Sequence, residues 1–527
     1  MNLSFTRKSS RLVQLLAASL ACAMMVLVLA PVSSEAKKPE QGKNSDSARL
    51  RRAVSADSIN LHLKELQDIA VENDGNRASG FPGFDASADY VVGELEGAGY
   101  DVTRQEFDFD TFIVNAPAQL DQTAPTPTTY TENEDFAYME FSGSGDVTAG
   151  VTNVDLVLPP GPDPSTSNSG CEESDFAGFP AGDIALMQRG TCDFGLKAVN
   201  AANAGAVGAI IFNEGQPGRT DVIAGTLGSF RPGIPTFGMS FELGNELAGI
   251  PDLELHMFAD TTIETRTTEN ILAETPGGDP DNVVMAGGHL DSVQEGPGIN
   301  DNGSGTMSLL DIALKMKQLK IKPENKIRFA FWGAEESGLI GSTLYVDDLV
   351  ANDPEEFSKI AMYLNFDMVG SPNFVRFVYD GDGSAFPDVG GGPAGSDKIE
   401  AAFTDFWANR GLESEETAFD GRSDYLAFIL NGVPSGGLFS GAEVLKTEEQ
   451  EAIYGGVAGL AYDPCYHQAC DTFFNTSDTA LNQFSDVMAH VIAKYANNTD
   501  GIGQEEAAAL RTKAGRNTVF HGSHATR

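Results

Sequence analysis

The chain has 527 residues, of which 41% are hydrophobic, so it is long enough for more than one domain with a large core. It carries 34 Lys and Arg against 76 Asp and Glu, which gives a net charge of −42. This charge argues against binding to nucleic acid or to an anionic membrane surface, because both are held mainly through phosphate groups.

The first 36 residues have the pattern of a secretory signal peptide. Basic residues between Arg7 and Arg11 precede an apolar segment over 12–30, and small residues end at Ala36. The pattern predicts cleavage after Ala36 and a secreted protein, extracellular or periplasmic, with no stable membrane association after cleavage. A retained membrane anchor is the alternative, because the apolar segment is long for a signal core.

The chain after the predicted cleavage site begins with a polar segment. Residues 37–54 are partly basic and predict a flexible leader or propeptide. Apolar residues at helical spacing over 59–70 predict the first folded helix, with Ser and Asp directly before it as caps. A second helix over 85–96 and a strand over 100–107 are expected to follow.

Residues 116–265 differ in composition, with many Pro, Thr, Gly and Ser between short apolar runs, which predicts an inserted domain. Within it, a strand over 183–187, a helix over 194–204 and a strand over 207–212 predict a small βαβ unit. We expect no catalytic cluster in this domain, because its one histidine, His256, is isolated.

Strand and helix patterns alternate from residue 266 to 496. Buried strands are predicted over 283–286, 327–332 and 360–366, and a helix over 306–319. The alternation predicts an α/β fold with a mostly parallel sheet covered by helices. The end of the chain, 497–527, is polar and is expected to be a disordered tail.

Four cysteines remain after removal of the signal, and an even number in an exported chain predicts two disulfides. Three pairings are conceivable, and proximity in the sequence favours Cys171 with Cys192 and Cys465 with Cys470. The second bridge would close a tight loop around His467.

Side chains that bind metals follow the predicted strands. His289, Glu336 and Asp367 each come shortly after one of the three strands, and Asp301 and His467 lie in polar loops. The carboxyl ends of parallel strands lie at one edge of the sheet, and active sites of open α/β sheets form at that edge. Two imidazoles with three carboxylates, one of which can bridge, predict a two-metal hydrolase. Nitrogen and oxygen ligands without a thiolate favour zinc, with manganese or cobalt as feasible alternatives.

Glu335 directly precedes Glu336, and neighbouring residues in a loop point in different directions. One of them can therefore bind metal while the other faces a water between the metals. This predicts Glu335 as the general base, a role typically worth about 10²–10⁴ in rate. The alternative is a pair of solvated carboxylates.

Five motifs, in chain order, resemble those of the co-catalytic di-zinc exopeptidases, which include secreted leucyl-type aminopeptidases, aminopeptidase Y and glutamate carboxypeptidase. The motifs are His289-Leu290-Asp291, Asn300-Asp301-Asn302-Gly303-Ser304-Gly305, Gly333-Ala334-Glu335-Glu336-Ser337-Gly338-Leu339 with Gly341-Ser342, Asn365-Phe366-Asp367-Met368, and Tyr466-His467. Two further segments, 76–80 and 421–425, resemble the secreted aminopeptidase branch. The resemblance covers about 55–115 and 266–496 and implies the sandwich fold of that family, with a mostly parallel mixed sheet covered by helices.

The resemblance also implies how the metals are held. His289 and Asp367 would bind one Zn²⁺, Glu336 and His467 the other, and Asp301 would bridge the two ions. A cis peptide bond after the bridging Asp301 is a trait of the family.

Four more roles follow from the resemblance. Glu335 would be the general base, and Asp291 would orient His289. Tyr466 would stabilise the oxyanion, and Arg422 would help to position the substrate.

The insertion resembles a protease-associated (PA) domain, a β-rich module. The matching segments are Gly170-Cys171, Gly182-Asp183-Ile184-Ala185-Leu186, Arg189-Gly190-Thr191-Cys192-Asp193-Phe194, Lys197-Ala198 and Ala204-Gly205-Ala206. The match supports the pairing of Cys171 with Cys192. In such enzymes the domain lies beside the active site as a lid or substrate filter.

These features together predict a secreted zinc aminopeptidase with two Zn²⁺ ions per chain. It would release N-terminal, leucine-like residues from peptides with a free N-terminus, through attack of a hydroxide held between the two ions. A carboxypeptidase or dipeptidase with the same centre is one alternative, with Arg422 reading the carboxylate. A non-catalytic binding protein is another, although it would be expected to have lost ligands or base. Nothing in the sequence indicates an oligomeric state.

Overall fold

The structure is a computed structural model that describes residues 43–502, with side chains from residue 46 onward. The predicted signal peptide, the start of the leader and most of the predicted tail lie outside the described residues. Within 43–502, no helix combines the length and apolarity needed to cross a membrane.

The described residues form twelve α-helices. They are α1 (Lys43–Ala53), α2 (Ala56–Glu72), α3 (Pro82–Gly97), α4 (Phe194–Asn203), α5 (Phe241–Ala248), α6 (Gly305–Gln318), α7 (Ile340–Asn352), α8 (Pro354–Ser358), α9 (Ser396–Ala408), α10 (Tyr425–Leu430), α11 (Glu448–Tyr454) and α12 (Asp478–Tyr495). Two 3₁₀ turns, η1 (Glu173–Phe176) and η3 (Phe473–Asn475), and a π turn, η2 (Ile299–Ser304), complete the helical elements of this range.

Fourteen strands form one continuous sheet in the described part of the chain. They are β1 (Asp101–Ala124), β2 (Thr128–Thr129), β3 (Phe136–Tyr138), β4 (Gly145–Asn153), β5 (Ile184–Gln188), β6 (Gly208–Phe212), β7 (Thr236–Met239), β8 (Glu254–Glu274), β9 (Asp279–His289), β10 (Asn325–Trp332), β11 (Ile360–Phe366), β12 (Phe377–Tyr379), β13 (Glu415–Thr417) and β14 (Ser435–Phe439). Their order is β13-β12-β14-β11-β9-β10-β8-β4-β5-β6-β7-β3, with β1 paired to β8 and β2 to β1.

The centre of the sheet is parallel, as predicted. β10, β9, β11 and β14 run in the same direction, while β8 is antiparallel to β10 and β12 is antiparallel to β14. The carboxyl ends of β9, β10 and β11 therefore lie at one edge of the sheet, which is the edge where open α/β sheets bind ligands.

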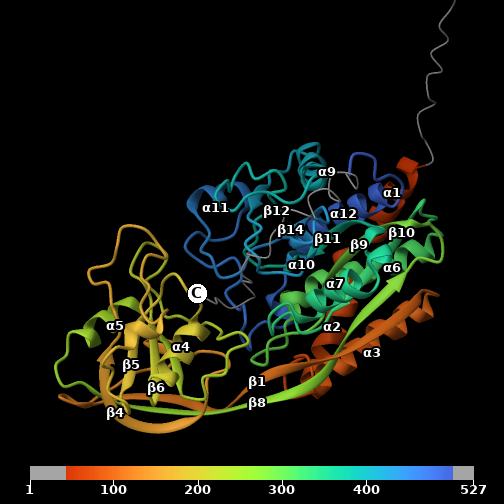
Figure 1. The fold of residues 1–527 in the computed structure, drawn as a ribbon. Helices are drawn as coiled ribbons and strands as arrows, with labels where there is room; N and C mark the ends of the chain where they lie inside the picture. The colour runs from red at the N-terminus through yellow and green to blue at the C-terminus, as the bar shows by residue number, and fades with distance from the viewer. Residues whose placement is uncertain (1–42, 503–527) are drawn as a thin grey trace, which may run out of the picture. The chain divides into compact units, whose positions relative to one another are not determined.

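Helices cover both faces of this parallel region (Figure 1). Successive side chains of a strand point to opposite faces, so neighbours in β9 enter different cores. Val284 packs in the core with α2, α3, α6, α9 and α12, whereas Val283 packs in the core with α7 and α10. The near-continuous apolar runs in these strands reflect burial on both faces.

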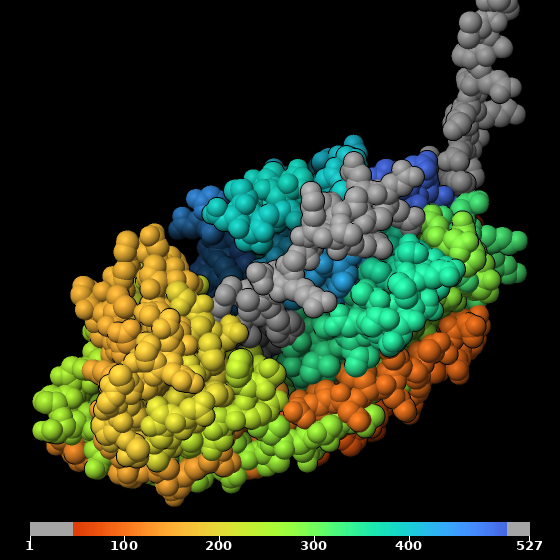
Figure 2. Space-filling model, in the orientation of Figure 1, coloured from red at the N-terminus to blue at the C-terminus, as the bar shows by residue number. Residues whose placement is uncertain are grey.

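Two long strands connect the parallel region of the sheet to the insertion. β1 and β8 pair from Asp101–Glu274 to Ala124–Glu254, and both strands run through the predicted boundaries at 116 and 265, with shifts of register on either side of Ala116 (Figure 1). The predicted boundaries therefore fall inside strands and not in linkers, because the composition changes while the pairing continues. Figure 2 shows the side chains of α3, in orange, along those of β8, in light green.

Inside the insertion the predicted βαβ unit is present as β5, α4 and β6. These strands and β7 are parallel, and β4 joins them to β8. Their apolar side chains form two cores of their own, one of which contains Ile210 and Met257.

The prediction of a flexible leader over 37–54 is wrong for residues 43–53, which form α1. Leu50 is fully buried in the main core, and the guanidinium of Arg51 lies 2.8 Å from the Asp486 carboxylate of α12. The segment looks polar in sequence because Leu50 and Val54 are its main buried apolar side chains. These two side chains are enough to anchor α1, because they pack against the apolar face of α12.

Both predicted disulfides are present, Cys171 with Cys192 in the insertion and Cys465 with Cys470 around His467.

Replacing Leu50 with alanine should lower the free energy of unfolding by about 2–5 kcal/mol, because it opens a cavity in a packed core. Arg52→Ala, on the exposed side of the same helix, should change it by less than about 0.5 kcal/mol. Chemical denaturation of both variants measures the difference. Equal stability of Leu50→Ala and the parent protein would mean that α1 does not pack on the core.

Candidate metal centre

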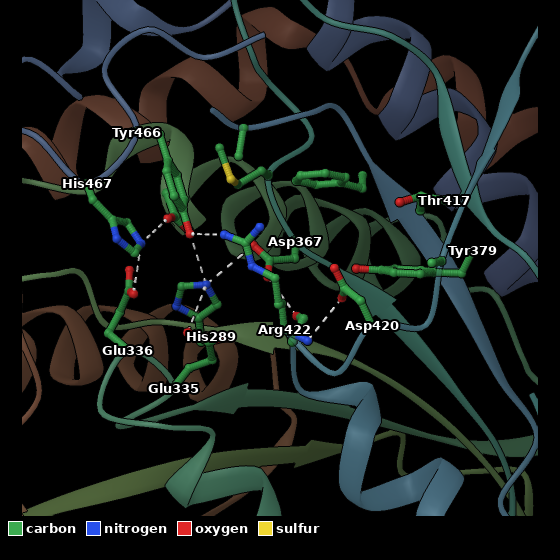
Figure 3. A pocket seen from close by; sticks show the side chains of 16 residues that line it. His289, Glu335, Glu336, Asp367, Tyr379, Thr417, Asp420, Arg422, Tyr466 and His467 are labelled. Carbon is green, nitrogen blue, oxygen red and sulfur yellow. Dashed lines mark hydrogen bonds and ion pairs between the residues drawn. The ribbon is translucent and has the colours of Figure 1, made fainter. Parts of the chain in front are cut away.

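The sheet brings together all five side chains predicted as metal ligands. His289 ends β9, Glu336 follows β10 in a short loop, and Asp367 follows β11 directly. Asp301 lies in the η2 turn before α6, and His467 lies in the loop between α11 and η3. Asp301 and the other four line one pocket, and Figure 3 labels His289, Glu336, Asp367 and His467 there.

Asp301 lies between the two histidines. Its Oδ1 is 3.2 Å from His289 Nε2, and its Oδ2 is 3.2 Å from His467 Nε2. One carboxylate thus presents a different oxygen to each imidazole, which is the arrangement that a bridging ligand needs.

The other two carboxylates extend this arrangement on either side. Asp367 Oδ1 lies 3.3 Å from His289 Nε2, and Glu336 Oε2 lies 3.1 Å from His467 Nε2. The donor atoms of His289, Asp301 and Glu336 also lie within 4.8 Å of one another. The result is two adjoining sets of nitrogen and oxygen donors that share Asp301.

The charges of the pocket are unbalanced. Asp301, Glu335, Glu336 and Asp367 are all buried, and burial raises the pKa of Glu336 to about 7 and that of Glu335 well above its usual value. Burial alone would lower the pKa of His289, but Glu335 and Asp367 raise it well above normal. Divalent cations would offset this buried negative charge, and a nitrogen and oxygen donor set without thiolate fits Zn²⁺.

Asp291, predicted to orient His289, also contacts the loop that carries the two glutamates. Its carboxylate accepts the backbone N–H groups of Glu335 and Glu336 at 3.2 and 3.3 Å. The nearest acceptor for His289 Nδ1 is the main-chain oxygen of Asp291 at 3.1 Å, while the carboxylate lies 3.6 Å away. Asp291 therefore joins the His289 loop to the glutamate loop.

A buried chain of hydrogen bonds, which the sequence did not reveal, ends on Asp367. Trp332 Nε1 donates to the Tyr363 hydroxyl, which donates to Asn365 Oδ1; Asn365 Nδ2 then donates to Ser423 Oγ. Ser423 donates to Asp367 Oδ2 at 2.6 Å, on the oxygen turned away from His289. Because an indole can only donate and a carboxylate can only accept, the chain has one direction.

Arg77 is a second feature without an assigned role from the sequence. Its guanidinium is fully buried and donates to the carbonyl oxygens of Leu290, Pro297 and Gly298 at 2.5–2.8 Å. Burial lowers its pKa to about 10, which still leaves it charged at neutral pH. Arg77 thus ties the loop after His289 to the start of the Asp301 turn and adds a fixed positive charge behind the carboxylates.

The Asp301 turn is held from its other side by Asp471. The buried Asp471 carboxylate accepts the backbone N–H groups of Asn300 and Asp301, at 3.0 Å for each. Burial raises the pKa of Asp471 to about 8. The peptide bond between Asp301 and Asn302 is cis, as the resemblance implied.

Tyr466 and Arg422 lie at the mouth of the pocket. Arg422 donates from Nη1 to Glu443 Oε1 at 2.8 Å. It also donates from Nη2 to the Tyr466 hydroxyl at 3.2 Å (Figure 3). Because the phenol oxygen accepts this bond, the Tyr466 hydrogen is free to point at another acceptor. The phenol is thereby prepared to donate.

The remaining walls of the pocket are partly apolar. They include Met368, Tyr379, Thr417, Ala418, Phe439 and Ala442, together with the Asp420 carboxylate.

Comparison with known proteins points to one family. The model of "Peptidase family M28" matches residues 270–492, and the model of the "PA domain" matches residues 151–247. An aminopeptidase of Pseudomonas aeruginosa is 50% identical over 464 residues, which is 87% of this chain and 84% of that protein. Leucine aminopeptidase 2 of Arthroderma otae is 40% identical over 464 residues, 86% of each chain.

Solved structures show the same fold. An aminopeptidase from Aneurinibacillus sp. strain AM-1 superposes with a TM-score of 0.67 at 24% identity, over 86% of this chain and 97% of that one. A zinc aminopeptidase from Bacillus subtilis gives a TM-score of 0.58 at 24% identity, over 85% and 96%.

Removing the Ser423 hydroxyl should weaken metal binding. Ser423→Ala frees Asp367 Oδ2 from its donor, so one of two Zn²⁺ ions should bind about 10- to 100-fold more weakly. Ser435→Ala is the matched control, because that buried hydroxyl donates only to the Val433 carbonyl oxygen. Titration with Zn²⁺ against a chromophoric chelator measures the zinc affinity of each variant. Coinciding titration curves for Ser423→Ala and Ser435→Ala would contradict the orienting role of Ser423.

Proposed function

The chain belongs to peptidase family M28, and we propose that it is a secreted zinc aminopeptidase that removes apolar, leucine-like residues from the N-terminus of peptides. The observation that carries this proposal is the position of Asp301 between His289 and His467, with one oxygen toward each. Two Zn²⁺ ions would be held by His289 with Asp367 and by His467 with Glu336, and Asp301 would belong to both.

Zinc, when bound, supplies Lewis-acid catalysis for the hydrolysis of a carbonyl group near neutral pH. The chain itself supplies the proton transfers. Glu335 is buried in the pocket, 4.0 Å from His289 Nε2, and its neighbours and burial raise its affinity for a proton. We assign it the role of taking a proton from the attacking water and passing it to the leaving amine.

Tyr466 is placed to stabilise the substrate oxygen as it becomes negative. Its hydroxyl already accepts from Arg422, so it offers its own hydrogen to the developing oxyanion. Arg422 thus acts through Tyr466 and adds positive charge on the same side of the pocket.

The pocket also supports a preference for a free amine and an apolar side chain. The carboxylates that line it favour a cationic amino group, and Met368, Tyr379 and Phe439 offer apolar contacts for the first side chain. The curated relatives named leucine aminopeptidase agree with this preference.

The carboxypeptidase or dipeptidase alternative requires a cation to read a free carboxylate. Arg422 lines the pocket with its guanidinium, and its Nη1 already lies 2.8 Å from Glu443 Oε1. An incoming carboxylate would have to displace Glu443, so the structure favours the aminopeptidase.

Secretion rests on the signal pattern over 1–36 and agrees with two disulfides in the described residues. We assign 55–115 and 266–496 to the peptidase domain and 116–265 to the PA insertion. N-terminal sequencing of protein from the culture medium tests the predicted start at Lys37.

The mature protein should cleave leucyl-p-nitroanilide but not its N-acetylated form, because acetylation removes the charged amine. Chelation should abolish the cleavage and Zn²⁺ should restore it. Absorbance of released nitroaniline measures both. Cleavage of the acetylated substrate, or full activity after verified removal of metal, would contradict the proposal.

Glu335→Gln keeps the shape of the side chain and removes its ability to accept a proton. The rate should fall by about 10²–10⁴, while the protein still binds two Zn²⁺ ions by metal analysis. Substantial residual turnover with normal zinc content would show that another group is the base.

A further inference from the structure

A hairpin beside the pocket carries an unusual number of exposed apolar side chains. The hairpin, residues 444–460, contains Val444, Leu445, Ile453, Val457 and Leu460, five of the fourteen large apolar side chains exposed among the described residues. Val444 and Leu445 are each 58% exposed. Single exposed apolar residues are common on proteins, but such a concentration in one segment marks a binding surface.

Backbone hydrogen bonds bring the two ends of this hairpin together. Leu445 forms an isolated antiparallel bridge with Ala461, and the Lys446 N–H donates to the Leu460 carbonyl oxygen at 2.9 Å. The Tyr462 N–H donates to the Val444 carbonyl oxygen at 3.0 Å. These backbone bonds fix the two ends of the hairpin, which carry Val444, Leu445 and Leu460, next to each other.

The hairpin starts at the rim of the pocket. Ala442 lines the pocket, and Glu443 pairs with Arg422, which lines it too. The side chains of Arg422 and Glu443 are 37% and 50% exposed, so this pair is at the open side. Val444 and Leu445 are the next two residues along the chain.

We infer that the 444–460 hairpin binds the third and fourth residues of a peptide substrate, an inference that rests on the proposed aminopeptidase function. A peptide whose first residue fills the pocket places these residues about 7–10 Å away in an extended chain. Ala442 lines the pocket, and Val444 and Leu445 follow it by two and three residues, so their backbone lies within about 10 Å of that wall.

The charged side chains around the hairpin would also influence which substrate residues it binds. The first turn of α11, within the hairpin, carries Glu448, Glu449 and Glu451, while Lys446 is buried. An apolar surface next to three carboxylates favours apolar residues in the substrate and disfavours acidic ones. The preferred substrates therefore have a leucine-like residue at the third position.

The test uses the peptides Leu-Gly-Xaa-Gly-amide with leucine, glycine or aspartate at Xaa. The wild-type kcat/KM for leucine should exceed that for glycine about fivefold, as expected for partial burial of one leucine side chain, and aspartate should rank below glycine. In Leu445→Ser and in Val444→Ser the ratio of leucine to glycine should fall toward one.

Two controls separate this effect from a general loss. Leucyl-p-nitroanilide ends before the hairpin, so its kcat/KM should stay unchanged in both variants. Leu61→Ser removes an apolar side chain that is 72% exposed on α2, and it should keep the wild-type ratio. Melting temperatures confirm that all three variants fold.

An unchanged leucine-to-glycine ratio in both hairpin variants overturns the inference, and so does a wild-type ratio of one. In either case cleavage of leucyl-p-nitroanilide shows that the proposed function still stands. If the wild-type protein cleaves none of these substrates, the proposed function fails and the inference fails with it. Sedimentation tests whether the surface binds a second copy of the chain instead. A dimer that dissociates in Leu445→Ser, together with an unchanged leucine-to-glycine ratio, would assign the surface to that second copy and overturn the inference.

Discussion

The mutual repulsion of buried carboxylates is the constraint on which the site depends. Asp301, Glu335, Glu336 and Asp367 approach one another around two histidines, away from bulk water. Such a cluster is costly unless cations offset it and the backbone holds it in place. The parallel strands β9, β10 and β11 meet this need, because they deliver their ends to one edge and are fixed by burial on both faces.

Neutral hydrogen-bond donors and the buried Arg77 guanidinium also hold the carboxylates and their loops in place. Asp291 and Asp471 accept backbone N–H groups from the glutamate loop and from the Asp301 turn, and Arg77 binds three carbonyl oxygens behind them. Ser423 occupies one oxygen of Asp367 and leaves the other toward His289. Each of these contacts fixes the position of a ligand through its surroundings.

The sequence predicted the parts of this account that have a local pattern. The apolar runs over 283–286, 327–332 and 360–366 predicted strands, and each predicted ligand after them lies in the pocket. Segment 76–80 was singled out, but the role of Arg77 within it was not predicted, because its acceptors are carbonyl oxygens, which every residue has. Ser423 reaches Asp367 across 56 positions, and no local pattern indicates such a contact.

Composition was a poorer guide than periodicity. The change in composition at 116 and 265 concealed that β1 and β8 continue through both positions, since pairing depends on the backbone. α1 was taken for a flexible leader because few apolar residues show its packing.

X-ray diffraction from crystals of the zinc-loaded protein, recorded on both sides of the zinc absorption edge, tests the central claim most directly. The account predicts two anomalous peaks, one beside His289 and Asp367 and one beside Glu336 and His467, with Asp301 in contact with both. A single peak, or none, at these residues in a zinc-replete crystal would contradict it.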